Sequence, residues 1–327
     1  MIIQLCLGLI ILGITVCFSS WGIFRVQHKF WSTVPGPHFY HHIGTEIGLC
    51  KSGIIRKDAA QHPPYHSQLN EPVPLELAKI SEYVNFFNRN YNISSDYKHI
   101  FTADALIERL FAPGVIGLHL IDEDAKVIGV IASCPLHTKF ATVATVGMID
   151  YLCVDSSVRG VGLANYMISW MDRTTSLVGR RVHFFEREMK PAPIPAIQQT
   201  IYMYCECSGD GIKIRNKEAI DAVASEYTVI DANIYTRTDI WADKTATGAW
   251  IVQNAHMTSL SGSFGIVLGI VGNPIVEMRQ LSPWKYLISP REYVESDENG
   301  IWKYSSTGWT HIYNYIPDRT QTLKILY

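Results

Sequence analysis

The stretch from Ile149 to Ala164 constrains the fold of this 327-residue chain more than any other. Apolar residues alternate up to Val154, which is typical of a half-buried strand. The turn that follows contains Gly160 and Gly162, and apolar residues then recur at helical spacing from Ala164 onward. Because glycine lacks the Cβ atom that keeps a ligand from the main chain, amide groups at the start of this helix can point at an anion. The sequence therefore predicts a strand, an anion-binding turn and a helix.

The residues around the glycines limit which kind of anion-binding turn this segment can form. Arg159 precedes them and adds a fixed positive charge. A dinucleotide-binding turn would need Gly-x-Gly-x-x-Gly, and a nucleoside triphosphate loop would need Gly-Lys-Ser or Gly-Lys-Thr, neither of which stands here. The alternative is an ordinary glycine-rich connection between a strand and a helix.

The pattern Arg-Gly-x-Gly-x-Ala at residues 159–164 resembles the pyrophosphate loop of the GNAT acyltransferase superfamily. Further segments, read in chain order, are similar to motifs of the eukaryotic N-myristoyltransferases, a two-lobed branch of that superfamily. These segments are His28–Pro35, Asn88–Tyr91, Leu110–Gly114, Ile149–Val154, Lys190–Ile194 and, more loosely, Ile312–Tyr315. Their order and spacing agree from residue 28 to about 205, whereas the second half agrees only at its end.

The resemblance implies an α+β fold, with a GNAT-like mixed sheet flanked by helices and a reduced second lobe of the same kind. The implied domains are a transmembrane anchor (1–24), an extended arm that covers CoA (25–70), an acyl-CoA-binding lobe (71–210) and a shortened C-terminal lobe (211–327). The implied acyl donor is myristoyl-CoA or, in the alternative of a GNAT N-acetyltransferase, acetyl-CoA. The implied partner is an acceptor peptide or protein N-terminus, with glycine as the acylated residue.

The same resemblance implies roles for individual residues. Acyl transfer from a thioester to an amine needs a polarised carbonyl and a deprotonated amine. The amides of Tyr151 and Leu152 would form the oxyanion hole, and the terminal carboxylate of Tyr327 would accept the proton. The expected acceptor contacts are Asn90, Tyr91 and Phe185. The residues expected at acyl-CoA are Lys29, Phe30, Trp31, Leu152, Cys153, Val154, Arg159, Gly160, Val161, Gly162, Leu163 and Ala164.

Two departures from the family pattern concern the acceptor side. A Thr-Ala-Gly motif that helps to bind the substrate amine corresponds here to Phe185–Arg187, so the usual peptide specificity does not carry over directly. The asparagine of the oxyanion strand is replaced by Asp150, which is either a second base or an ion-paired carboxylate. A catalytically inactive acyl-CoA or acyl-peptide binding protein is therefore a third alternative.

The N-terminal segment from Ile2 to Phe24 carries no charged residue and is long enough to cross a ~30 Å hydrocarbon core as a helix. We expect a single-pass membrane anchor. Because Arg25 and Lys29 follow the segment, the positive-inside tendency predicts that the catalytic body faces the cytosol. A cleaved signal peptide is the alternative, but it would favour basic residues before the apolar run.

Composition excludes some partners and favours others. The 28 basic and 30 acidic side chains give no net positive field that would collect nucleic acid. The seven cysteines have no spacing typical of a zinc site, which favours free thiols in a reducing compartment and no bound metal.

Periodicity predicts the remaining elements coarsely. An amphipathic helix is expected over Leu77–Phe87, and Thr102 is expected to cap a second helix. Two alternating segments are expected to form a hairpin that leads to the central strand. The other expected elements are the hairpin strands Val115–Ile121 and Lys126–Pro135, a helix over 160–177, a strand over 181–185 and a buried strand at Phe264–Val271.

Overall fold

The computed structural model describes residues 2–28, 30–31, 41, 53–55, 70–91, 98–139, 146–188, 190–259, 262–294, 300–316 and 323–326. Its helices are α1 (Ile2–Gln27), α4 (Ile80–Asn90), α5 (Ala103–Leu110), α6 (Leu163–Leu177), α7 (Lys217–Ser225) and α8 (Ile275–Leu281). Its strands are β1 (Gly53–Ile54), β2 (Val73–Pro74), β3 (Lys98–His99), β4 (Ile116–Ile121), β5 (Val127–Thr138), β6 (Val146–Val154), β7 (Val182–Glu188), β8 (Gln198–Glu206), β9 (Val229–Asp231), β10 (Ile240–Lys244), β11 (Gly248–Ser259), β12 (Gly262–Gly272), β13 (Tyr286–Pro290), β14 (Lys303–Tyr313), β15 (Tyr315–Ile316) and β16 (Ile325–Leu326).

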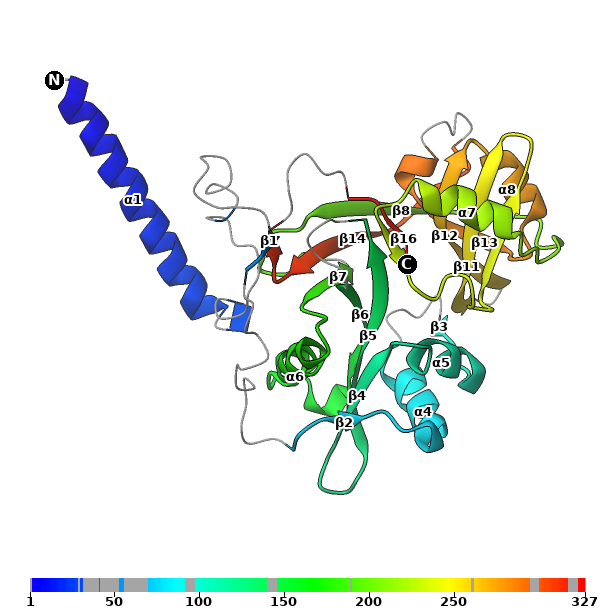
Figure 1. Ribbon diagram of the computed structural model, residues 1–327, viewed down its shortest axis with the longest axis horizontal. Coiled ribbons are helices and arrows are strands. Elements are labelled where there is room, and N and C mark those ends of the chain that lie inside the picture. The colour runs from blue at the N-terminus through cyan, green and yellow to red at the C-terminus, as the bar shows by residue number, and fades with distance from the viewer. Residues whose placement is uncertain are drawn as a thin grey trace.

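The first half of the body has three layers. Strands β4, β5 and β6 run antiparallel, and β7 pairs parallel with β6 after the crossover helix α6. Side chains alternate between the two faces of the sheet. Ile131 of β5 therefore packs with α6, whereas Val130 and Ala132 pack with α4 and α5 on the opposite face (Figure 1).

The second half repeats this order of elements. Strands β10, β11 and β12 run antiparallel, and β13 pairs parallel with β12 after helix α8. Helix α7 packs on β10, β11 and β12 through Ile220 and Val223. Helix α8 has 7 residues where the corresponding α6 has 15, so the second crossover is much shorter than the first.

The two halves exchange their last strands. Strand β14, from the end of the second half, pairs with β7 on one side and with β8 on the other. Strand β8, from the end of the first half, pairs in turn with β13. Within the described residues this exchange joins both halves into one sheet of 14 strands (Figure 1).

Several expectations from the sequence are confirmed. Strands β4 and β5 form the expected hairpin, and β12 is the expected strand near residue 264. The side chain of Thr102 accepts a hydrogen bond of 3.2 Å from the amide of Ala105 and caps α5. The expected start of the next helix at residue 160 is wrong. Gly160 and Gly162 adopt φ values of +87° and +86°, so helical geometry begins only at Leu163.

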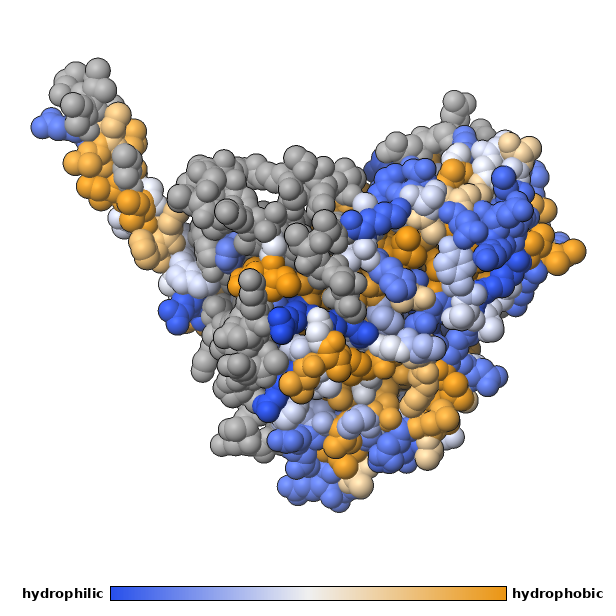
Figure 2. Space-filling view, in the orientation of Figure 1, coloured by the Kyte–Doolittle hydropathy of each residue, from blue (hydrophilic) through white to orange (hydrophobic). Residues whose placement is uncertain are grey.

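Helix α1 stands apart from the body. Most of its described side chains are exposed and apolar, and Figure 2 shows the middle of this helix largely in orange. Among the helices that the structure describes, it alone is long and apolar enough to cross a membrane, over Cys6–Gln27 with a mean hydropathy of 2.1. Length and composition fit a membrane span, and they fit a signal sequence as well.

The position of β14 predicts how stability depends on it. Ile312 is fully buried against β5, β6 and β7, whereas Tyr304 on the same strand is exposed. We expect Ile312→Ala to lower the free energy of unfolding by about 2–5 kcal/mol, because it leaves a cavity in the core. Tyr304→Ala should change it by less than about 0.5 kcal/mol. Urea denaturation of both variants measures the difference, and equal losses would contradict the role given to β14.

Candidate functional site

The site is centred on an irregularity in β6. Val130 pairs with Cys153 and Ala132 pairs with Asp150, so Tyr151 and Leu152 together lie opposite one residue of β5. Such a bulge re-aims main-chain groups out of the ladder. Tyr151 has φ +55°, which is a costly conformation for a residue with a side chain. Its ring packs edge-on against Phe87 at 5.6 Å, which helps to hold the backbone in this conformation.

Strands β6 and β7 separate beside the bulge. Their parallel pairing begins at Val146 and Val182 and ends at Ile149 and Phe185, so Leu152 lies beyond the last pair. A cavity occupies this position. Its lining residues are Trp31, Ile149, Leu152, Ile168, Asp172, His183, Phe185, Glu186 and Tyr313, and we call it the strand-gap cavity.

Aromatic stacking closes one side of the strand-gap cavity. The ring of Trp31 stacks on Phe185 with centroids 5.8 Å apart, and Phe185 stacks on His311 at 4.9 Å. Phe30 is buried beside Trp31. Two of the three arm residues predicted from the sequence thus lie at the core of the fold, while Lys29 lies outside the described residues.

Polar groups also line this cavity. Tyr313 donates a hydrogen bond of 3.2 Å to Asp172, and Tyr202 donates one of 3.0 Å to Glu186. Burial, together with the nearby charge of Arg180, lowers the pKa of His183 to about 3. His183 is therefore neutral at physiological pH, and its Nε2 atom has no hydrogen-bond partner within the described part of the chain.

The glycine turn follows directly after the bulge. Asp155 accepts hydrogen bonds from the amide and hydroxyl of Ser157 and forms ion pairs with Arg89 at 2.7 Å and Lys126 at 3.3 Å. Burial alone would raise the pKa of Asp155, but the hydrogen bonds from Ser157 and the charge of Lys126 hold it well below its usual range. The carboxylate therefore stays charged and fixes the start of the turn. Val161 is 65% exposed at the tip, between the two glycines.

Several predicted ligand residues have partners inside the protein. The guanidinium of Arg159 donates to the carbonyl oxygens of Val154 at 3.2 Å and Asn90 at 2.7 Å. The side chain of Asn90 accepts from the amide of Ser156 at 2.9 Å, so these residues tie the turn to α4. Tyr91 packs edge-on against other rings. Cys153, Val154 and Leu163 are buried, and Ala164 is half-buried in the core around α6. Their contacts with acyl-CoA or acceptor stay predictions.

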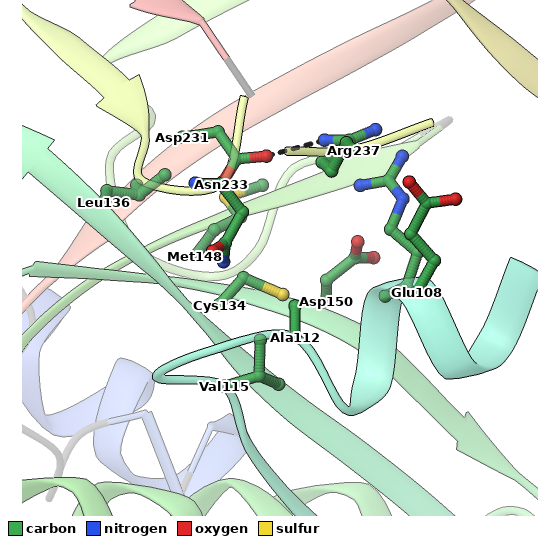
Figure 3. Close-up of a pocket in the computed structure, with 11 residues that line it drawn as sticks. Glu108, Ala112, Val115, Cys134, Leu136, Met148, Asp150, Asp231, Asn233 and Arg237 are labelled. Carbon is green, nitrogen blue, oxygen red and sulfur yellow. Dashed lines mark hydrogen bonds and ion pairs between the residues drawn. The ribbon is translucent and has the colours of Figure 1, made fainter. Parts of the chain in front are cut away.

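A second cavity lies on the other side of the bulge, and we call it the acidic cavity. Figure 3 shows the carboxylate of Asp150 directed into it, with Cys134 and Asn233 nearby and Arg237 across from them. It lies between α5, β5, β6 and the segment that follows β9. The lining residues are Glu108, Arg109, Ala112, Val115, Cys134, Leu136, Met148, Asp150, Asp231, Asn233 and Arg237.

Ion pairs organise the wall of the acidic cavity. Arg237 bonds Asp231 at 2.6 Å and Asp239 at 2.9 Å, and Arg109 bonds Asp239 at 3.2 Å. Burial alone would raise the pKa of Asp239, but Arg109, His256 and Arg237 hold it far below its ordinary value. Both arginines are thereby fixed in place through the carboxylate of Asp239, which they share.

The expected ion pair of Asp150 is not found. None of the ion pairs among the residues that the structure describes involves Asp150. Its Oδ1 atom instead accepts a hydrogen bond of 2.7 Å from the amide of Tyr151. Of the two interpretations made from the sequence, an ion-paired carboxylate therefore gains no support.

The end of the chain approaches the acidic cavity. Strand β16 runs parallel to β9, with Leu326 opposite Ile230. The residue after Ile230 is Asp231, which lines the cavity. Tyr327, the predicted base, lies outside the described residues.

Sequence reasoning missed most of the acidic cavity. Arg109 comes from α5 and Cys134 from β5, whereas Asn233 and Arg237 come from the segment after β9, which the pairing of β9 with β5 brings to this place. No motif or residue spacing in the sequence predicts the pairing of these two strands. The nearest signal was the cluster of charged residues over 231–239 in an otherwise apolar neighbourhood.

The first half combines a bulged strand, a splayed parallel pair and a glycine turn before a helix, and the second half repeats its order of strands. This fold of two similar halves is shared with solved acyltransferase structures. The particular likeness is to N-myristoyltransferase of Saccharomyces cerevisiae. Its crystal structure with bound myristoyl-CoA matches with a TM-score of 0.66 and 12% identity, over 92% of this chain and 99% of that chain. A structure of the same enzyme with myristoyl-CoA and inhibitors matches with a TM-score of 0.65 and 13% identity, over 89% of this chain and 90% of that one.

A further structure of the yeast enzyme with bound myristoyl-CoA matches with a TM-score of 0.64 and 12% identity, over 94% of this chain and 99% of that chain. No protein-family model and no curated protein matches the sequence. At this level of identity the structural match establishes the fold.

The burial of two cysteines at the bulge predicts their reactivity. Burial raises the pKa of Cys134 and of Cys153 to about 12, so both remain thiols at neutral pH and neither is suited to form an acyl-enzyme. We expect iodoacetamide to leave both unmodified in the folded protein and to modify both after unfolding in urea, as measured by peptide mass spectrometry. Rapid labelling of Cys134 in the folded state would make a thioester intermediate the better mechanism.

Proposed function

We propose that this chain is an acyl-CoA-dependent N-acyltransferase that acylates the N-terminal amine of a peptide, with glycine as the acceptor residue. The observation that carries the proposal is the bulge at Tyr151 and Leu152, placed between the separated ends of β6 and β7 and followed by the glycine turn. Main-chain donors at such a position can stabilise the oxyanion that forms on a thioester carbonyl.

The donor side of the proposed site consists of the strand-gap cavity and the glycine turn. The pyrophosphate of CoA would bind at the N-terminus of α6, where Gly160 and Gly162 leave the main chain open. The thioester would then pass between β6 and β7 towards Leu152, under the cover of Trp31. Each of these contacts uses the main chain or an aromatic ring, so none requires a positively charged side chain at the turn.

The acceptor side of the proposed site is the acidic cavity, which opens on the other side of the same bulge. An amine there would attack the thioester carbon. A carbon–nitrogen bond forms, the carbon–sulfur bond breaks, and the proton lost by the amine passes to a base while CoA leaves as the thiol. The resemblance gives the role of base to the carboxylate of Tyr327. The carboxylate of Asp150, which lines the acidic cavity, would hold the charged amine before it reacts.

A short acyl group is the second candidate, and the strand-gap cavity favours it. Asp172, His183 and Glu186 line this cavity, and a long alkyl chain would cover them without offering a hydrogen bond. Transfer of an acetyl group would leave them in contact with the polar pantetheine arm. The alternative of a catalytically inactive acyl-CoA binding protein is favoured by the replacement of the Thr-Ala-Gly motif by Phe185–Arg187.

We propose further that α1 anchors the enzyme in a membrane, with the body on the cytosolic side, where acyl-CoA is available. The support is its apolar surface and its separation from the body. An anchor of this kind would keep the acidic cavity near the membrane surface, so acceptors could be proteins that are themselves recruited there.

The full chain in detergent micelles tests the activity directly. Acyl-CoA donors from acetyl to myristoyl are supplied with a short peptide that has a free N-terminal glycine, and mass spectrometry follows the acylated peptide. We expect acylation of the free amine and none of the N-acetylated twin, since the lone pair of an amide nitrogen is delocalised into its carbonyl and does not attack a thioester. Donor binding without any acylated product would favour the inactive binding protein.

The glycine turn supplies a second prediction. Because Val161 is exposed, a charged side chain there should leave the fold intact and repel the phosphates of CoA. We expect Val161→Glu to weaken acyl-CoA binding roughly tenfold at low salt, with a smaller effect at high salt. Val161→Gln has the same shape without the charge and should bind nearly as the unmodified chain does. Calorimetric titration measures both, and equal affinity of the two variants would remove the turn from the site.

A further inference from the structure

One of the two proposed oxyanion donors already has an acceptor. The amide of Tyr151 donates to Oδ1 of Asp150 at 2.7 Å, a short bond to a charged oxygen. Bonds of this kind are stronger than those to neutral carbonyls. A thioester carbonyl would therefore have to compete with the carboxylate for the same N–H group.

The carboxylate that occupies the donor also faces the acceptor side. Asp150 lines the acidic cavity, and Figure 3 shows its oxygen atoms directed into the space between Cys134 and Glu108. A rotation about the side-chain bonds of Asp150 would therefore exchange the Tyr151 amide for a group bound in the cavity. The two sites share this single carboxylate.

The other charges around the cavity are already paired. Arg237 is bonded to Asp231 and Asp239, and both bonds of Arg109 go to Asp239. Glu108 accepts hydrogen bonds from the amide and hydroxyl of Thr238. Four carboxylates, those of Glu108, Asp150, Asp231 and Asp239, thus face the two guanidinium groups of Arg109 and Arg237, with His256 at the edge, 3.8 Å from Asp239. The excess negative charge suits a cation.

We propose that Asp150 is a positioning residue that couples acceptor binding to the formation of the oxyanion hole. In the free protein its carboxylate accepts the hydrogen bond of the Tyr151 amide, so this amide does not bind a thioester carbonyl. A cationic amine in the acidic cavity draws the carboxylate away, and the freed N–H group then binds the thioester carbonyl. The proposal rests on the proposed acyl transfer, and it explains how a thioester could sit beside water without being hydrolysed before an acceptor arrives.

A carboxylate that only shapes the bulge would behave differently. Its removal would lower the stability of the fold. The position of the carboxylate would depend neither on the charge of the acceptor nor on which group the Tyr151 amide binds. Two variants separate these roles. Asp150→Ala removes both the charge and the acceptor oxygen, whereas Asp150→Asn keeps an oxygen for the amide and loses the attraction for a cation.

The state of the Tyr151 amide can be observed without any reaction. The full chain is labelled with ¹⁵N-tyrosine in detergent micelles, and Tyr151→Phe identifies the signal by removing it. We expect a downfield amide proton in the free protein and an upfield shift in Asp150→Ala. A peptide with a free N-terminal glycine should move the signal of the unmodified chain towards the Asp150→Ala position, whereas its N-acetylated twin should not, and Asp150→Asn should show no response.

An amide signal that is the same in Asp150→Ala, or that responds equally to both peptides, would overturn the proposal. Kinetics give an independent readout. Without an acceptor, water hydrolyses the thioester and CoA is released. Asp150→Ala should release CoA from acyl-CoA about fivefold faster than the unmodified chain, since its Tyr151 amide can bind the thioester carbonyl at all times. Asp150→Asn should keep the slow release and raise the KM for the acceptor roughly tenfold. Slow release by Asp150→Ala, or an unchanged acceptor KM in Asp150→Asn, would count against the coupling.

The two hypotheses fail in different ways. If the unmodified chain acylates no peptide with any donor, the proposed function fails. The spectroscopic response to the peptide amine still decides whether Asp150 exchanges partners. If acylation occurs and the amide signal does not respond to the peptide, the proposed function is supported and the proposed coupling of acceptor binding to the oxyanion hole is wrong.

Discussion

The register shift between β5 and β6 is the feature on which the rest of the site depends. It places two residues opposite one, turns the amide of Tyr151 out of the ladder and leaves Leu152 beyond the last pair with β7. One strand thus has a cavity on each side: aromatic rings, aliphatic side chains and a few polar groups line one, and a cluster of carboxylates and arginines lines the other. A regular strand at the same place would satisfy its own amides and would separate the two cavities by a continuous ladder.

The exchange of strands between the halves keeps this geometry rigid. The wall of the acidic cavity includes Arg109 from the first half and Arg237 from the second, joined through Asp239. Strand β14 holds the two halves in one sheet, so a hinge between them would break its pairs with β7 or β8. A site built from both halves needs such a connection, because a displacement of about 1 Å already costs much of the benefit of positioning.

The sequence predicted the part of the site that is local in the chain. Strand, glycine turn and helix follow one another within residues 149–177, and the alternation of apolar residues and the two glycines was enough to place them. Thr102 was identified as a cap for the same reason, since its partner is only three residues away. The start of α6 was placed early, because composition does not show that both glycines adopt positive φ.

The part of the site that depends on distant pairing could not be predicted. The segment after β9 reaches Asp150 only because β9 pairs with the end of β5, where Leu136 faces Asp231. The role of Arg159 was also beyond reach, since its bond to Asn90 joins residues that are far apart in the chain. Charge and motif suggested a contact with the ligand, which stays a prediction, and the structure adds that this guanidinium ties the turn to α4.

The distribution of main-chain and side-chain groups explains how a fold can persist at 12% identity while most side chains differ. The donor side rests on main-chain amides, on glycine conformations and on stacked rings, so most substitutions leave it intact. The proposed acceptor side rests on individual charges, and here it has Asp150 at the bulge, where the resemblance expects asparagine. A change of acceptor therefore requires few substitutions, whereas a change of donor chemistry would require a different backbone.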